Sequence, residues 1–521
     1  MPALTLNGRS LQAEPGTTIL AAAAQLGVEI PTLCSLEGLE PDPHCMLCVV
    51  KVRGFRGMVP ACATVATDGM EVTTDDPEIR AARQTALELL LSDHVGDCMA
   101  PCQLGCPAHM HIPRMIRGIA AGDLGRAIEV VKADIVLPGV LGRICPAPCE
   151  KACRRGKIDQ PVSICLLKRF AADADMASAS PYLPKPRASR GKRVAIVGAG
   201  PAGLAAAYSL RREGLDCTVF DDRDKPGGML RHGVARESLP LNVLDREIGL
   251  IAGLGVRFRP GVRVGPDVSL SQLRQDYDAV FLAVGQSAVE QAGPWGLTAG
   301  PKGLVVDSRT YQTNIEGVYA GGDAVRGRRL AVRSVADGKE AALCIGQFLT
   351  GRPVTGPERP FNTHMGTLSE EEQQRLLALA GGQARTSPSG PDGGLTPDQA
   401  RQEALRCLHC DCRKADSCRL REWSHAYDAR PARFKGIRRP LHLNTSHPDV
   451  VYESGKCIDC GLCVRITEQA KERLGLAFVG RGFDVRVAVP LAADLSAGLT
   501  ETARRCVEAC PTGALSLKDR V

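Results

Sequence analysis

The sequence is short of aromatic residues and of long apolar runs. Phe, Trp and Tyr make up 4% of its 521 residues, so its cores must rely on aliphatic side chains. No apolar run reaches the roughly 18 residues that a membrane-spanning helix needs. The stretch from Met1 to Ala13 also lacks the basic and then apolar layout of a signal peptide. We therefore expect a cytoplasmic protein with no direct membrane span.

A strong charge of either sign is also missing. Lys and Arg total 65 against 58 for Asp and Glu, a net charge of +7. Spread over this length, the bias is that of an ordinary solvated surface, and we expect no nucleic-acid partner. The hydrophobic (44%) and charged (24%) fractions are those of a globular protein, and the length allows three to four domains at roughly 150 residues each.

What the sequence has in abundance is cysteine, with 22 residues. In a large chain without an export signal, such thiols are kept reduced, so metal or redox ligation is favoured over disulfides. Cys217 and Cys344 stand alone in apolar stretches, as small core residues do. Nearly all the others fall into tight groups: 34/45/48/62, 98/102/106, 145/149/153, 407/410/412/418, 457/460/463 and 506/510.

The first group follows two short alternating segments around Asn7-Gly8 and a helical run from Thr18 to Leu26. Its spacing is Cys34-x10-Cys45-x2-Cys48-x13-Cys62. A two-iron cluster requires four thiolates, two for each iron. Zinc is the alternative, although the outlying ligands stand far from the central pair, unlike a paired-knuckle zinc site.

The stretch EPGTTILAAAAQLGVEIPTLC resembles the β-grasp ferredoxin domain that begins the large iron–sulfur subunit of NADH:ubiquinone oxidoreductase (complex I). The resemblance covers residues 1–97 and implies a [2Fe–2S] domain over residues 1–80. It continues into His94-x3-Cys98, which in that family begins a [4Fe–4S] site with one histidine ligand. The later spacing departs from the family, because Cys98-x3-Cys102-x3-Cys106 stands where the family has Cys-x2-Cys-x5-Cys.

From Cys102 the chain resembles a different family. CQLGCPAHMHIP, GRICPAPCEKACRRG and PVSICLLKRFAAD are similar to the amino-terminal domain of the glutamate synthase small subunit, a module shared with dihydropyrimidine dehydrogenase. This implies a helical domain over residues 81–176 with two [4Fe–4S] clusters. Prolines at 107, 146 and 148 force irregular backbone near the thiols, which frees N–H groups for the sulfides.

Two cubane clusters need eight ligands, and six cysteines of this region are clear. His94 and Cys165 are the candidates for the other two places. Cys165 lies on an apolar helical stretch, where a buried thiol is common. The predicted ligands are Cys98, Cys102, Cys106, Cys145, Cys149, Cys153, His94 and Cys165.

A linker at 177–190 precedes KRVAIVGAGPAGLAAAYSL, an apolar strand, a Gly198-x-Gly200-x-x-Gly203 loop and a helix. In such a loop the glycines permit a tight turn, close approach of a pyrophosphate and strand–helix packing, and the helix N-terminus favours phosphate. A second strand ends at Asp221, 23 residues after Gly198 and in place for ribose hydroxyls. We predict an FAD-binding domain over residues 191–352.

FAD rather than a nicotinamide cofactor follows from further resemblance to the glutamate synthase small subunit. DKPGGMLRHGV, DAVFLAVGQ and GVYAGGDAV are similar to its flavin segments, and Asp323 matches the acid that holds the ribityl chain there. The predicted cofactor-binding residues are Gly198, Gly200, Pro201, Ala202, Gly203, Asp221, Gly228, Arg231, Val284, Gly285, Gly322 and Asp323.

That family inserts an NADPH-binding domain between the second and third of these segments. Here Gly285 and Gly317 are separated by only 31 residues, about the length of one βαβ unit, and no second G-x-G-x-x-G occurs in the chain. We therefore expect no nicotinamide site.

A linker over residues 353–399, rich in Gly, Pro and Ser from 381 to 396, leads to a Cys-rich segment at 400–430. Its spacing is Cys407-x2-Cys410-x-Cys412-x5-Cys418. Four cysteines so close together can wrap one metal centre. Spacing alone does not separate zinc from a [4Fe–4S] cluster, and the redox context favours the cluster.

Residues 445–521 resemble the two-cluster ferredoxin-like part of the complex I large subunit. Each motif of such ferredoxins is Cys-x2-Cys-x2-Cys-x3-Cys, and the fourth Cys serves the other cluster. By that rule Cys457, Cys460, Cys463 and Cys510 hold one [4Fe–4S] cluster. Thr467, Thr500 and Ala503 stand at ligand positions, so the second cluster is lost and Cys506 is left as a core thiol.

The predicted fold class is multidomain α/β and α+β: β-grasp ferredoxin, helical iron–sulfur, Rossmann-type FAD and ferredoxin-like domains. With one FAD, one [2Fe–2S] and up to four [4Fe–4S] clusters, and no nucleophile constellation or Walker motif, we expect no catalytic residue of its own. The function predicted is that of an electron-transfer subunit whose partners are other oxidoreductase subunits, catalytic or NAD(P)H- or ferredoxin-linked. The alternatives are a stand-alone NAD(P)H oxidoreductase and a flavin-based electron-bifurcating subunit.

Overall fold

The computed structural model describes residues 1–327, 330–380 and 383–518. Residues 328–329, 381–382 and 519–521, which fall in the predicted FAD-binding domain, linker and ferredoxin-like domain, lie outside the described residues. The chain forms two compact units, each assembled from separate stretches of sequence. Unit 1 holds residues 1–99, 360–376 and 410–518, and unit 2 holds the described residues within 100–359 and 377–409.

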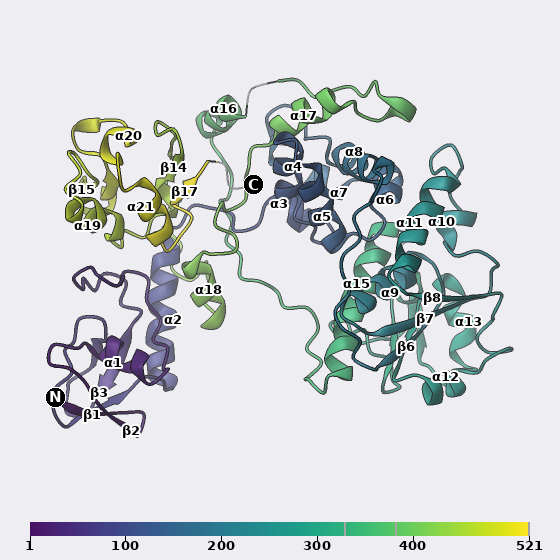
Figure 1. Ribbon diagram of the computed structural model, residues 1–521, viewed down its shortest axis with the longest axis horizontal. Helices are drawn as coiled ribbons and strands as arrows, with labels where there is room; N and C mark the ends of the chain where they lie inside the picture. The colour runs from purple at the N-terminus through teal and green to yellow at the C-terminus, as the bar shows by residue number, and fades with distance from the viewer. Residues whose placement is uncertain (328–329, 381–382, 519–521) are drawn as a thin grey trace. The chain divides into compact units, whose positions relative to one another are not determined.

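Unit 1 begins with a five-stranded sheet in the order β2-β1-β5-β3-β4 (purple in Figure 1). Asn7 and Gly8 both have positive φ, which suits the two-residue turn between β1 and β2. The Thr18 hydroxyl accepts from the Ala21 N–H and caps the helix that follows. The elements are β1 (Ala3–Leu6), β2 (Arg9–Gln12), α1 (Ile19–Gln25), β3 (Val49–Val52), β4 (Met58–Pro60), β5 (Met70–Thr73) and α2 (Pro77–Ser92).

The carboxy-terminal stretch completes unit 1. A three-stranded sheet, β13-β14-β17, carries the loops and short helices that bear the last cysteines. β15 and β16 form a separate antiparallel pair. The elements are α18 (Arg419–Ala426), β13 (Leu443–Asn444), β14 (Val450–Glu453), η4 (Ser454–Lys456), α19 (Leu462–Gln469), β15 (Ala477–Val479), η5 (Gly482–Asp484), β16 (Arg486–Ala488), η6 (Pro490–Ala492), α20 (Leu495–Gly498), α21 (Ala503–Ala509) and β17 (Leu515–Leu517).

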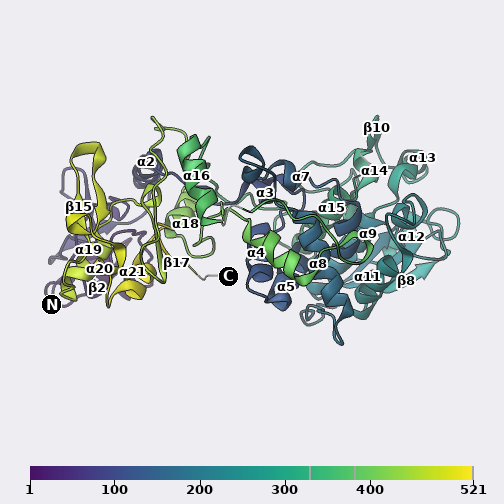
Figure 2. The same ribbon diagram turned by 90° about the horizontal axis from the view of Figure 1, so that it is seen from above.

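Unit 2 begins with a helical part. Helix α4 packs against α5 and α17, and α8 packs against α5 and α6, so helices from both ends of the unit lie together (Figure 2). Prolines at the first turn start α3, α4, α6, α7 and α17. The elements are α3 (Pro101–Gly105), α4 (Ile112–Ala120), α5 (Leu124–Asp134), α6 (Pro138–Ile144), α7 (Pro148–Lys151), η1 (Arg154–Lys157), α8 (Ile164–Ala177), η3 (Pro391–Gly393) and α17 (Pro397–Leu405).

The rest of unit 2 is a parallel sheet with strand order β12-β9-β6-β7-β8, and helices α9 and α15 pack against each other beside it. All five residues of β6 but the first are buried, as expected of a central parallel strand. The sheet elements are β6 (Arg193–Val197), α9 (Pro201–Arg212), β7 (Asp216–Asp221), α11 (Leu241–Gly253), β8 (Arg257–Pro260), α12 (Leu270–Asp276), β9 (Ala279–Leu282), β12 (Val318–Ala320) and α15 (Ala331–Leu349).

Shorter elements complete the chain: α10 (Met229–His232), η2 (Gly285–Ser287), α13 (Ala288–Ala292), β10 (Ala299–Gly300), β11 (Gly303–Leu304), α14 (Asp323–Arg326) and α16 (Glu370–Leu379). The segment between Gly285 and Gly317 consists of η2, α13 and the two-residue strands β10 and β11. The predicted mixed class, with ferredoxin-type and Rossmann-type parts, is confirmed by these sheets and helices.

Candidate redox centres

The four amino-terminal cysteines of unit 1 are all buried and face one another. The sulfurs of Cys34 and Cys45 are 3.4 Å apart. Hydrogen bonds with the Cys45 and Cys62 thiols lower the pKa of Cys34 to about 2. A hydrogen bond with the Cys62 thiol lowers the pKa of Cys48 to about 7. Backbone N–H groups of Cys45 and His44 also point at the Cys34 sulfur. Four converging thiols with N–H donors suit a [2Fe–2S] cluster.

The carboxy-terminal group of unit 1 surrounds a small cavity of about 20 Å³. Cys457, Cys460, Cys463 and Cys510, from the η4–α19 loop and the end of α21, all line it. Cys506 is fully buried one turn earlier on α21, where its thiol contacts the Thr502 hydroxyl. The cavity therefore gathers the thiols that the swapped-ligand rule selects, and the donors fit a cubane cluster.

A third group in unit 1 brings together residues more than 300 positions apart. The Cys412 N–H donates to the Cys98 carbonyl at 3.4 Å. A hydrogen bond with the Cys418 thiol lowers the pKa of Cys412 to about 6. A Cβ at Gly513 would stand 2.5 Å from the Cys412 sulfur, so only glycine leaves room there. The structure thus places Cys98 beside Cys412 and Cys418, although the sequence analysis assigned them to different groups.

His94 lies in the same region of unit 1. Burial, with the charges of Lys456 and Lys435, lowers its pKa to about 4, which keeps the imidazole neutral. Its Nδ1 is buried with no hydrogen-bond partner among the described residues. A neutral imidazole with an unsatisfied nitrogen is suited to ligate a metal.

A four-thiol group also occurs in unit 2, around the buried side chain of Lys168 on α8. The Cys165 thiol forms hydrogen bonds with the thiols of Cys145 and Cys149. The Lys168 Nζ stands 3.9 Å from the Cys165 sulfur. Burial opposes protonation of Lys168, but the negative charges of Cys165, Cys145, Cys149 and Cys106 outweigh it and raise its pKa. Cys165 therefore lies within this thiol group.

The remaining predicted ligands belong to neighbouring segments. Cys102 is on α3, which packs against α7, and Cys153 follows α7. Cys407 directly follows Arg406, the C-cap residue of α17. The Arg406 carbonyl accepts a hydrogen bond from the Arg155 guanidinium at 2.5 Å. Cys410 begins the last stretch of unit 1.

The described residues include no three His, Cys, Asp or Glu side chains that converge on a single metal ion. Ligands of a cluster stand farther apart than ligands of one ion, since they bind different iron atoms.

The glycine loop of unit 2 has the geometry of a dinucleotide cradle. Gly198 has a φ of +103°, and a Cβ there would stand 2.4 Å from the Ala283 carbonyl oxygen. A Cβ at Gly203 would stand 1.9 Å from the Gly198 carbonyl oxygen. Gly200 caps α9 without any side-chain bond, which leaves the first-turn N–H groups of α9 to a ligand. The cradle fits the pyrophosphate of a dinucleotide.

Two of the predicted cofactor residues lie beside this loop. The Asp221 carboxylate accepts from the Ala199 N–H at 2.6 Å, at the end of β7. Gly228 has a φ of +49°, and a Cβ there would stand 2.9 Å from Gly200. A third predicted residue, Arg231, pairs with Asp245 and donates to the Pro226 carbonyl at 2.8 Å.

The other end of the predicted flavin site is fixed by a buried carboxylate that the sequence analysis missed. Asp337 on α15 is fully buried, accepts from the Gly322 N–H at 3.2 Å and pairs with Arg326 at 3.1 Å. It holds the turn that presents Asp323 at the start of α14. Its signal in the sequence is an acid between small residues of a helix, in SVADG.

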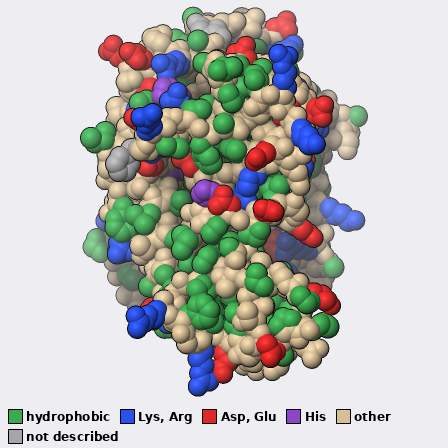
Figure 3. Space-filling view, turned by 90° about the vertical axis from the view of Figure 1, so that its left-hand side faces the viewer, with side chains coloured by type: hydrophobic (Ala, Val, Ile, Leu, Met, Phe, Trp, Pro, Cys, Tyr) green, Lys and Arg blue, Asp and Glu red, His purple; other side chains and the backbone are tan. Residues whose placement is uncertain are grey.

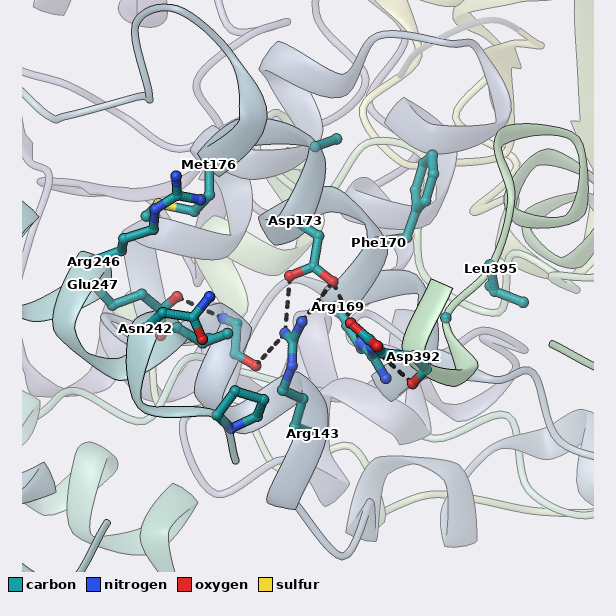
Figure 4. A pocket seen from close by; sticks show the side chains of 15 residues that line it. Arg143, Arg169, Phe170, Asp173, Met176, Asn242, Arg246, Glu247, Asp392 and Leu395 are labelled. Atoms are coloured by element: carbon teal, nitrogen blue, oxygen red, sulfur yellow. Dashed lines mark hydrogen bonds and ion pairs between the residues drawn. The ribbon is translucent and has the colours of Figure 1, made fainter. Parts of the chain in front are cut away.

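A pocket of about 430 Å³ in unit 2 lies elsewhere, between α6, α8, α11 and the segment at 392–395 (Figure 4). Asp173 accepts from Arg143 at 2.9 Å and from Arg169 at 3.3 Å, and Arg169 also donates to the Asp392 carbonyl. These charges satisfy one another, and the residues that line the pocket include none of the predicted cofactor residues.

The face of unit 1 seen in Figure 3 carries apolar side chains scattered between charged ones. The exposed apolar residues of unit 1 include Met46, at 44% exposure, which lies between the predicted ligands Cys45 and Cys48. The loop of the [2Fe–2S] site therefore reaches the surface. Among the described residues, no helix combines the length and apolarity that crossing a membrane requires.

Comparison with protein-family models gives three matches. Residues 3–77 match a 2Fe-2S iron-sulfur cluster binding domain, and residues 92–180 match dihydropyrimidine dehydrogenase domain II, 4Fe-4S cluster. Residues 196–255 match an NAD(P)-binding Rossmann-like domain.

Similar curated proteins are oxidoreductase subunits. The beta subunit of the NADPH-Fe(3+) oxidoreductase of Geobacter sulfurreducens is 38% identical over 47% of this chain and 36% of its own length. The beta subunit of the NADP(+)-dependent formate dehydrogenase of Moorella thermoacetica is 40% identical over 40% and 32%. The glutamate synthase [NADPH] small chain of Mycobacterium tuberculosis is 42% identical over 37% and 40%.

The matched part of this chain thus spans a third to two fifths of these relatives. Among solved structures, an NAD+-reducing [NiFe]-hydrogenase aligns over 99% of this chain and 87% of its own, at 12% identity and a TM-score of 0.36, too low to carry an argument. The chain therefore contains a [2Fe–2S] domain, a [4Fe–4S] domain and a Rossmann-like domain, and it is similar in part to oxidoreductase subunits.

Proposed function

We propose that this chain is an electron-transfer subunit of a larger oxidoreductase, holding one FAD and five iron–sulfur clusters. The observation that carries the proposal is the convergence of buried thiols into separate four-ligand groups within one chain. FAD, when bound, exchanges electrons in pairs or singly, which suits an exchange with one-electron clusters. The chain's residues would hold and insulate these centres, and substrates would be handled by partner subunits.

The contacts support a new grouping of the twenty predicted ligands. In unit 1, His94, Cys98, Cys412 and Cys418 would hold one [4Fe–4S] cluster, beside those of the amino- and carboxy-terminal groups. In unit 2, the group of Cys106, Cys145, Cys149 and Cys165 would hold another. Four predicted ligands then remain, three in unit 2 and one in unit 1: Cys102, Cys153 and Cys407, and Cys410.

The sequence supports the split site independently. His94-x3-Cys98 supplies the start of the complex I pattern, which continues from that cysteine as Cys-x2-Cys-x5-Cys. Cys412-x5-Cys418 has the spacing of the missing end. We infer that unit 2 is inserted between the first and second cysteines of this motif, so that the motif is completed only in the folded chain.

The contacts also suggest an order of the centres in unit 1. Cys34, Cys45 and Cys460 belong to one buried cluster of side chains, which brings the [2Fe–2S] site next to the carboxy-terminal cubane site. The buried Lys456 precedes Cys457 and feels the charge of Cys412, so it lies between the carboxy-terminal and split sites. We infer that electrons pass along these three centres in that order.

The chain itself connects the two units near predicted ligands. It crosses between Met99 and Ala100, and again between His409 and Cys410. Cys98 and Cys102 flank the first crossing and are separated by four residue steps, which span at most about 15 Å. These two predicted ligands are therefore close neighbours along the chain at this crossing.

For the Rossmann-like domain, the alternative is an NAD(P) site, as the description of the matching family model names. It would make the chain a stand-alone NAD(P)H oxidoreductase. The resemblance of residues 224–234 and 317–325 to flavin segments favours FAD. In the region where the glutamate synthase family has its NADPH domain, the structure has only η2, α13, β10 and β11.

Anaerobic mixing of the purified chain with NADH or NADPH separates the two functions. We expect the flavin band near 450 nm to persist with both nucleotides and to bleach with a strong one-electron donor such as dithionite. Prompt bleaching by either nucleotide would overturn the proposed function in favour of the stand-alone oxidoreductase.

A further inference from the structure

One side chain of unit 1 joins the ligand loops of two centres. Arg465 lies on α19, two residues after Cys463. Its guanidinium donates to the Cys34 carbonyl at 2.8 Å and to the Cys460 carbonyl at 3.4 Å. A third bond, to the Glu40 carbonyl at 2.6 Å, fixes the loop between Cys34 and Cys45. Arg465 therefore ties the loop of the [2Fe–2S] site to the loop of the carboxy-terminal site.

The charge of Arg465 is not neutralised by an acid in these contacts. All three acceptors are backbone carbonyls, and its Nε is buried with no hydrogen-bond partner among the described residues. A guanidinium stays protonated at all accessible pH values. The full positive charge is thus held between two groups of sulfurs, where partial burial limits screening by solvent.

Such a charge acts on any redox centre beside it. Reduction of an iron–sulfur cluster adds one negative charge, and a nearby fixed cation favours the reduced form.

We propose that Arg465 is a positioning residue shared by two centres, and that its charge raises the reduction potentials of the [2Fe–2S] cluster and the carboxy-terminal [4Fe–4S] cluster together. The inference rests on the proposed function, because it requires both clusters. A shared cation would shift the potentials of the two neighbouring centres in the same direction, so that their difference, which drives transfer between them, changes little.

A merely structural role predicts a different result. If Arg465 only ties the two loops together, its variants would lose clusters or stability without a common shift in potential. Arg465→Gln removes the charge and keeps a hydrogen-bond donor. Arg465→Lys keeps the charge but loses the planar guanidinium, which donates to several carbonyls at once. Arg473 is exposed on the turn after α19 and serves as the matched control.

The test is an anaerobic redox titration of the full chain, followed by EPR, for the parent and for R465Q, R465K and R473Q. In R465Q we expect the reduction equilibria of both clusters to shift on the order of tenfold toward the oxidised form, about 59 mV lower for a one-electron couple. R465K and R473Q should leave both midpoints unchanged.

An R465Q protein that keeps both clusters at unchanged potentials would overturn the proposal. If R465Q fails to hold its clusters, the R465K protein decides between the two roles. Unchanged midpoint potentials in R465K would support a role for the charge, and midpoint potentials that are lowered for both clusters would contradict it. Failure of the proposed function has a separate signature, since the parent chain itself would then show no [2Fe–2S] signal.

Discussion

Two buried lysines of this chain, Lys168 and Lys456, stand beside thiols. Lys168 lies among four thiols in unit 2, and Lys456, paired with Glu453 at 2.7 Å, lies near Cys412 in unit 1. Burying a lysine is costly unless a negative charge compensates it. Reduced clusters with thiolate ligands carry such charge, which gives these lysines a reason to be buried.

Lys168 provides a test at this scale. In Lys168→Met we expect the unit 2 cluster beside Cys165 to assemble and its midpoint potential to fall, because a cation 3.9 Å from a ligand sulfur is removed. EPR-monitored titration measures the midpoint. Lys157 is exposed on η1 and gives the control K157M; equal potentials in K168M and K157M would contradict the account.

We expect the stability of the folded chain to depend on pH through Glu247. It is fully buried on α11 and accepts from the N–H groups of Gly139 and Val140 at the start of α6. Burial raises its pKa to about 7, and the N–H bonds and the charges of Lys132 and Arg143 only partly oppose this. In the unfolded chain this carboxyl titrates near its ordinary pKa of about 4.3. Between that pH and about pH 7 the folded state therefore holds a proton on Glu247 that the unfolded state has lost.

We therefore expect the parent chain to gain stability relative to Glu247→Gln as the pH falls from about 8 to about 5. The reason is that the folded form binds a proton there that the unfolded form releases. Anaerobic scanning calorimetry of both proteins, with clusters in place, measures the difference in melting temperature. A difference that stays constant with pH would contradict the raised pKa.

At the residue scale, the sequence predicted the types of the ligands better than their groups. Cys-x2-Cys spacing and the neighbouring prolines identified the thiols. Spacing along the chain could not show that Cys165 faces Cys145, or that Cys98 contacts Cys412, since these contacts depend on tertiary packing. Lys168 and Arg465 were missed because nothing in a single sequence separates a buried cation from a solvated one.

At the scale of elements, the strand–loop–helix of β6 and α9 was predicted from its pattern, because each glycine has a local steric reason. Gly203→Ala tests this. Its Cβ would stand 1.9 Å from the Gly198 carbonyl oxygen, so the loop must shift and we expect the bound flavin to fall by about tenfold or more. Gly249→Ala on α11 is the control, because nothing lies within 4 Å of its Cβ.

Flavin released from the purified proteins and total iron measure the outcome. Iron should stay unchanged in G203A, since its cysteines are untouched. Flavin retained at the level of G249A would contradict the assignment of this loop to the cofactor.

The split site is a prediction about elements far apart in the chain. Cys98→Ala and Cys412→Ala should each remove the same cluster, about four iron atoms, and leave the [2Fe–2S] EPR signal intact. Cys217→Ala, in the strand β7, should lose none. If the C98A and C412A proteins lost clusters with different spectroscopic signatures, the two cysteines would belong to different centres.

At the scale of the whole molecule, each unit is built from stretches that are not contiguous. From the sequence we predicted a row of consecutive domains, but two signs of an insertion were visible: the change of resemblance at Cys102 and the return of the complex I resemblance in residues 445–521. Residues 410–518 return to the unit that residues 1–99 began. The contacts between these distant segments depend on packing, which the sequence does not show directly.

The most direct test of the account is the cofactor content of the purified chain. Anaerobic iron, sulfide and flavin analysis should give one FAD and about 18 iron with about 18 sulfide, the sum of one [2Fe–2S] and four [4Fe–4S] clusters. About ten iron would mean that two cubanes are absent and that the grouping of the twenty ligands is wrong. A chain without FAD would contradict the proposed electron-transfer function itself.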